Sequence, residues 1–280
     1  MAILEQGHFD ATCYRNRGIG AASGDPDLDQ QILPRKLEDR NFYSRFRGLL
    51  KPQLKVLAAG TLNATGGGAA TGAAGDENYL TIIDGKGAQT LEYHILGTQT
   101  ILFPQRHADG LDIGMDQTDN DGVELCGGIE SGSYCAYTVG TDGAVFIRLK
   151  FSVADVSGTD DLAIGFRKRE AYQANVDDYD EMAALNVISG DIKIETILNA
   201  AATVTTDTTD NWADAATHTL EVRVSAAGVV TYLIDGAAPT TTAAFTFDNG
   251  EVVVPFLFFL NATDLAGEVV LKDLEFGFQV

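Results

Sequence analysis

Cysteine is scarce in this sequence of 280 residues, which contains Cys13, Cys126 and Cys135 and no others. An odd number of cysteines without CxxC or Cys/His ligand spacing does not favour a disulfide framework, and we expect reduced thiols. The alternative is that Cys126 and Cys135, on either side of a predicted Gly-Ser turn, lie close together. Long apolar runs are also missing. The longest, Val252 to Leu260, falls far short of the ~20 residues that a membrane helix needs, and the first ten residues do not resemble a secretory signal. These absences favour a protein made in a cytoplasm and not bound to a membrane.

Basic residues are few, with 19 Lys and Arg against 40 Asp and Glu, for a net charge of −21. The imbalance is uneven along the chain, because residues 1–55 hold nine basic and seven acidic side chains while the remainder holds ten and 33. An acidic body repels phosphate backbones, so we expect no binding of nucleic acid. The N-terminal segment is a physically separate part of the chain.

Two alternating runs, His218 to Val224 and Val229 to Ile234, are joined by a short link that ends in Gly228. Alternation with period two and a glycine link predict an antiparallel hairpin, followed by a turn at Asp235-Gly236. We expect Leu220, Val222 and Val224 to face the core, together with Leu233. Trp212 and His218 are expected to pack beside this hairpin.

Short runs of this kind follow one another after residue 78, separated by Gly, Asp and Asn. About fourteen strands are expected, including Gly122–Cys126, Met182–Ile188, Ala243–Phe247 and Val269–Phe278, with a loop in Ala171–Glu181. The pattern predicts an all-β antiparallel sandwich with an N-terminal arm and one short helix. We divide the chain into an arm with a basic amphipathic helix (1–56), a Gly/Ala-rich linker or loop (57–78) and the sandwich (79–280).

The tryptophan, the hairpin and the closing strand resemble the concanavalin A-like jelly rolls, a superfamily of laminin-G-like modules, legume-type lectins and certain glucanases. The resemblance covers roughly residues 75–280 and implies a jelly-roll sandwich. Phe146 to Ser152 and Asp161 to Arg167 also look like bacteriophage virion proteins that carry this domain.

Glucanases of this superfamily place alternating carboxylates on one strand, which brings an acid and a nucleophile into one cleft. Here Asp273 and Glu275 lie two apart, but on the last expected strand and without a third acid. The four histidines lack metal-ligand spacing, and neither a GxSxG sequence nor a phosphate loop is present. We therefore expect no catalytic residues, no cofactor and no enzymatic activity.

Phe42, Phe46, Leu49 and Leu50 recur at helical spacing in the N-terminal segment. They predict a short amphipathic helix, with basic residues such as Arg40 and Arg45 around its other sides. The helix either covers one end of the sandwich or docks on a partner, in which case the partner-binding residues are Arg40, Phe42, Arg45, Phe46, Leu49 and Leu50.

Asp116, Asp119 and Asp121 belong to the densest acidic group of the sequence. Calcium prefers hard oxygen ligands, so a structural calcium ion is one interpretation. The spacing departs from the EF-hand rule, and solvated carboxylates in a turn are the alternative.

Together these features predict a non-enzymatic bacteriophage virion protein, a head decoration or cement protein that binds the outer capsid surface. Its partners would be the major capsid protein and neighbouring copies of itself in a homo-oligomer. The alternative is a carbohydrate-binding, lectin-like module on a virion fibre or adhesin.

Overall fold

The structure is a computed structural model that describes residues 53–58, 78–84, 87–97, 105–107, 109–114, 118–129, 132–133, 135–262 and 267–279. Contacts divide the chain into two compact units. One consists of Met1–Gln53 with Ile83–Gly87, almost all of it outside the described residues. The other consists of Leu54–Ile82 with Ala88–Val280 and contains the sandwich. The predicted arm and helix, including Arg40, Phe42, Arg45, Phe46, Leu49 and Leu50, lie outside the described residues, and the predicted domain boundaries stay a prediction.

Two antiparallel sheets build the sandwich. The ten-stranded sheet contains β1 (Gln53–Ala58), β2 (Asn78–Asp84), β3 (Gly87–Leu96), β6 (Gly122–Cys126), β17 (Val252–Asn261), β11 (Thr159–Lys168), β12 (Met182–Ile188), β13 (Asp191–Ile197) and β14 (Val204–Asn211) in this order, with β9 (Tyr137–Thr138) paired to β17. The six-stranded sheet has the order β16 (Val230–Ile234), β15 (Thr217–Val224), β10 (Val145–Val153), β18 (Val269–Phe278), β5 (Gly110–Asp112) and β4 (Gln105–His107). A separate ribbon pairs β7 (Gly128–Ile129) with β8 (Gly132–Ser133).

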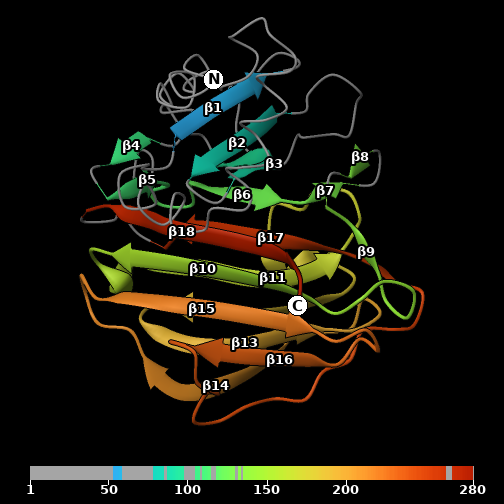
Figure 1. Cartoon of the computed structure of the whole chain (residues 1–280). Coiled ribbons are helices and arrows are strands. Elements are labelled where there is room, and N and C mark those ends of the chain that lie inside the picture. The colour runs from blue at the N-terminus through green and yellow to red at the C-terminus, as the bar shows by residue number, and fades with distance from the viewer. Residues whose placement is uncertain are drawn as a thin grey trace, which may run out of the picture. The chain divides into compact units, whose positions relative to one another are not determined.

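Figure 1 looks onto β10, β15, β16 and β18, with β11, β13 and β14 behind them. Strand β10 alternates strictly, so that Ile147 and Leu149 point into the space between the sheets. Leu162 and Ile164 of β11 enter the same core from the other sheet. The prediction of an all-β antiparallel jelly-roll sandwich is confirmed. In the described residues no helix has the length and hydropathy to cross a bilayer.

The predicted hairpin forms between β15 and β16, with Val222 opposite Tyr232 and Glu221 opposite Leu233. Leu220 and Val222 are buried in the core as predicted. The prediction for Leu233 is wrong, because the register gives the core position to Tyr232 and leaves Leu233 half-buried on the other face. Gly228 closes the link at a φ of +86°, and a Cβ there would lie 2.5 Å from the carbonyl oxygen of Phe247. The link therefore needs glycine at this position.

Strand β17 is apolar almost throughout because both of its faces are covered. Leu257 and Phe259 belong to the core between the sheets, whereas Phe256 and Phe258 belong to a second, smaller core on the outer face of the ten-stranded sheet. Residues 169–181, which we call the covering segment, lie over this second core and contribute Tyr172 and Val176. The segment contains the short 3-10 helix η3 (Val176–Asp178), in agreement with the predicted loop; a second, η2 (Val156–Gly158), precedes β11.

Strand β14 forms one edge of the ten-stranded sheet and was not predicted, because its Thr- and Asp-rich sequence has no apolar alternation. The edge is irregular: the register shifts between Asp191 and Lys193 of β13, and Thr209 has a φ of +64°. The Thr241 N–H donates to the Thr208 carbonyl oxygen at 2.9 Å, so a following loop covers part of this edge.

The register of the hairpin predicts that alanine substitutions of two leucines lower the free energy of unfolding by different amounts. Leu220→Ala should lower the free energy of unfolding by about 2–5 kcal/mol, because it leaves a cavity in the core. Leu233→Ala should lower it by about 1 kcal/mol, as at partly exposed positions. Denaturant unfolding of both variants measures the difference, and equal losses would contradict the register.

Candidate functional site

A row of charged side chains crosses the outer face of the six-stranded sheet. Arg148 of β10 lies directly opposite Glu221 of β15 and Glu275 of β18, because the strand registers align all three. The Arg148 guanidinium forms ion pairs with both carboxylates, and its Nη1 lies 3.7 Å from Glu221 Oε2. Arg223 Nε donates to Glu221 Oε1 at 2.6 Å. The row therefore fixes an arginine between two carboxylates on a solvent-facing sheet.

The next row along the strands contains Thr219, Lys150 and Asp273, again in register on β15, β10 and β18. Lys150 is exposed, and it makes no hydrogen bond or ion pair with any residue that the structure describes. Its ammonium group is therefore a donor available to a ligand.

Asp235 is placed beside these rows by a tight turn after β16. Asp235 and Gly236 both have positive φ, +50° and +84°, as a type I′ turn requires, so the predicted turn is confirmed. The Thr219 N–H donates to Asp235 Oδ1 at 2.8 Å, and His218 Nδ1 lies 2.7 Å from Oδ2. Partial burial opposes ionisation, but the hydrogen bonds from His218 and Thr219 outweigh it and lower the pKa of Asp235. This carboxylate is consequently ionised and oriented.

These groups surround an open pocket of about 410 Å³. Its lining consists of Arg148, Lys150, Thr219, Glu221, Asp235, Gly236 and Asp273. The lining contains both hydrogen-bond donors and acceptors, with two basic against three acidic side chains. Such a pocket suits a polar ligand that both donates and accepts hydrogen bonds.

Sequence reasoning set Asp273 and Glu275 aside because they lie on the closing strand. In the structure β18 lies in the interior of the sheet, next to β10, so both side chains join Arg148 and Lys150. The sequence contains the pattern that could have indicated this site, as two alternating runs, Phe146 to Lys150 and Lys272 to Glu275. Their pairing is a long-range contact that neither run reveals alone.

A second polar cluster lies on the outer face of the ten-stranded sheet. Asn186 of β12 donates through Nδ2 to Asp161 Oδ1 at 2.6 Å and to Glu195 Oε2 at 2.7 Å. Burial, together with the nearby negative charges of Asp160 and Glu195, raises the pKa of Asp161 to about 7, although the hydrogen bond from Asn186 opposes the shift. Two buried carboxylates therefore share one amide group.

The predicted calcium ligands are only partly described. Asp116 lies outside the described residues, Asp119 is exposed and Asp121 is buried. The calcium prediction stays a prediction. Trp212 is buried as expected, and its ring meets that of His218 edge-on at 4.8 Å. His218 thus packs on the tryptophan and also supports Asp235.

The fold is an all-β, antiparallel jelly-roll sandwich. No protein-family model matches the sequence, and neither does any curated protein. The potassium-bound carbohydrate recognition domain of Emp46p is similar in structure, with 9% identity over 63% of this chain and 86% of that chain and a TM-score of 0.48. The alginate lyase PA1167 from Pseudomonas aeruginosa is 13% identical over 72% and 97%, with a TM-score of 0.44. The marine PL7 alginate lyase AlyA1 from Zobellia galactanivorans is 13% identical over 82% and 95%, with a TM-score of 0.39.

These comparisons correct two predictions. The structures similar to this chain include alginate lyases, which are enzymes, and a carbohydrate recognition domain. Nothing in the described part of the chain ties it to a capsid. The predictions of a capsid decoration protein and of a protein without enzymatic activity are therefore contradicted, and the resemblance to virion proteins has no support.

The raised pKa of Asp161 predicts how stability depends on pH. The native state holds this proton more tightly than the unfolded chain, in which aspartate titrates near 4. The resulting stabilisation is complete below pH about 4 and is lost as the pH rises through about 7. The free energy of unfolding should therefore fall between pH 5 and pH 8, by on the order of 2 kcal/mol.

Asp161→Asn should flatten this pH dependence, as measured by denaturant unfolding at the two pH values. Asp191→Asn, at an exposed aspartate at the start of β13, is the matched control and should leave it unchanged. The same pH dependence in wild type and Asp161→Asn would assign it to other groups.

Proposed function

We propose that the protein binds carbohydrate in the pocket on the outer face of the six-stranded sheet. The observation that carries the proposal is the lining of this pocket, in which three carboxylates, a lysine and an arginine lie on paired strands and in the turn after β16. Sugar hydroxyl groups donate and accept hydrogen bonds at once, so a wall with both kinds of partner matches them. Asp235 and Asp273 accept, and Lys150 donates.

The charge of the site favours an uncharged, hydroxyl-rich glycan over a polymer of uronic acids. The lining has one more acidic than basic side chain, and Arg148 is already engaged by two carboxylates. The chain as a whole carries −21, which repels polyanions over a longer range. A neutral polysaccharide avoids both costs.

The test is a binding titration of the full chain against soluble neutral and uronate polysaccharides, by calorimetry in EDTA. Lys150→Ala should weaken binding of the neutral glycan by about 10–100-fold, because hydrogen bonds to a charged group are worth about 1.5–3 kcal/mol. Lys193→Ala, on β13 of the other sheet, is the control and should bind as the wild type does.

A reducing-end assay on the same mixtures separates binding from cleavage. The proposal fails if no glycan binds, or if Lys150→Ala binds the glycan as tightly as the wild type.

A further inference from the structure

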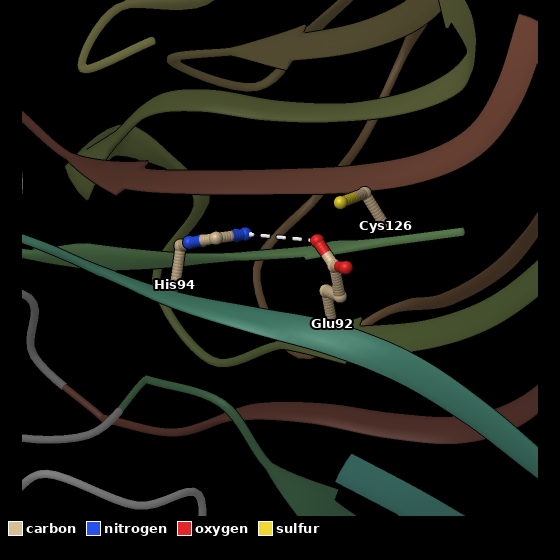
Figure 2. A group of neighbouring side chains, drawn as sticks. All are labelled: Glu92, His94 and Cys126. Carbon is tan, nitrogen blue, oxygen red and sulfur yellow. Dashed lines mark ion pairs between the residues drawn. The ribbon is translucent and has the colours of Figure 1, made fainter. Parts of the chain in front are cut away.

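Three side chains with metal-binding atoms meet in the second core, away from the pocket. Glu92 and His94 lie two residues apart on β3 and therefore point to the same side of the strand. Cys126 ends the neighbouring strand β6, directly opposite Glu92. Figure 2 shows the three side chains converging on one point. Sequence reasoning missed this group, because it sought a second histidine or cysteine near each histidine and not a glutamate or a partner on another strand.

The spacing fits a small metal ion. One ligand atom from each of the three residues lies within 4.8 Å of the other two. His94 Nε2 and Glu92 Oε2 are 3.6 Å apart, which is too long for a hydrogen bond. Two ligands at zinc-bonding distance in a tetrahedral site lie about 3.3–3.4 Å apart, so the His94–Glu92 pair is already near the separation of two zinc ligands.

Burial of these three side chains destabilises the fold unless their polar atoms have a partner. Glu92 and Cys126 have no exposed surface, and His94 is 5% exposed. Neither carboxylate oxygen of Glu92 nor Nε2 of His94 has a hydrogen-bond partner within the part of the chain that the structure describes. A buried carboxylate without hydrogen bonds is strongly destabilising, so these atoms indicate a ligand.

The buried cation whose charge acts on Cys126, Arg167, already has a carboxylate partner. Arg167 is fully buried, and its Nε donates to Glu124 Oε1 at 2.8 Å. Tyr179 donates its hydroxyl to the other oxygen of Glu124 at 2.7 Å. The charge of Glu92 is therefore left for His94 or for a bound cation to balance.

We propose that Glu92, His94 and Cys126 bind a zinc ion. Carboxylate, imidazole and thiolate are all zinc ligands, whereas calcium and magnesium take oxygen ligands. The charges balance, because a glutamate carboxylate and a cysteine thiolate together neutralise a divalent cation beside a neutral imidazole. In three-ligand zinc sites the fourth position holds water or a substrate.

One feature of the surroundings supports a built site. The His94 ring stacks on Tyr172 of the covering segment, with centroids 4.6 Å apart and planes at 18°, which fixes the orientation of the imidazole. Zinc binding displaces the proton of the Cys126 thiol to solvent and leaves the thiolate on the metal.

The experiment measures the metal directly in the full chain. The protein is unfolded with chelator and reductant and is refolded with Zn²⁺ or with EDTA, since a buried site fills most readily during folding. After desalting we expect one zinc per chain by elemental analysis and a melting temperature several degrees higher than in EDTA. Refolding with Co²⁺ should give the thiolate-to-cobalt charge-transfer absorption in the near ultraviolet.

Cys126→Ser should lose the charge-transfer band and bind zinc at least tenfold more weakly. Cys135→Ser, at the partly exposed cysteine, is the matched control and should retain both. Glu92→Gln removes the buried charge while keeping the shape, so it should fold in EDTA at least as stably as the wild type and bind zinc at least tenfold more weakly.

The proposal is overturned if the refolded wild type holds no zinc, in which case Glu92 and His94 form a metal-free ion pair. It is also overturned if Cys126→Ser binds zinc as the wild type does. If a variant does not fold, the cobalt spectrum of the wild type still decides, because a spectrum without a thiolate band excludes Cys126 as a ligand.

Discussion

Strand β17 sends large apolar side chains to both sides of the ten-stranded sheet, so both faces must be shielded from water. The six-stranded sheet covers one face, and the covering segment, residues 169–181, covers part of the other. Polar side chains on the strands next to β17 are buried along with it, namely Glu124 of β6 and Arg167 of β11, and so is Glu92 of β3, one strand further away. The burial of one apolar strand therefore determines where charged groups are enclosed and must find partners.

Local patterns predicted much of the fold. The alternation in β10, β15 and β18 predicted their positions to within two residues, and Asp235-Gly236 predicted the turn. Prediction failed where the structure of a segment depends on the strand with which it pairs. Residues 243–247 have a strand-like sequence but form a single bridge, between Thr246 and Val229. Leu233 and Tyr232 are both apolar enough for the core, and the pairing with β15 decides which of them enters it.

The candidate sites were harder to predict than the strands because each combines residues that are distant in sequence. The pocket joins β10, β15 and β18, and the metal-binding group joins β3 to β6. In each strand the polar residues alternate as they would on any solvated face. The register between neighbouring strands decides which polar residues lie side by side and form a site. A single sequence does not directly indicate this register.

The irregular edge formed by β14 has a consequence for how copies of the protein can associate. A free sheet edge is a template for a strand from another molecule, and proteins suppress such pairing with charges, bulges and covering loops. All three are present at β14. The charges are those of Asp207 and Asp210, the register shift in its pairing with β13 is the irregularity, and the loop that contains Thr241 covers part of the edge. Growth of the sheet from one molecule into the next is blocked on this side. Pairing of strands between molecules would have to use another sheet edge.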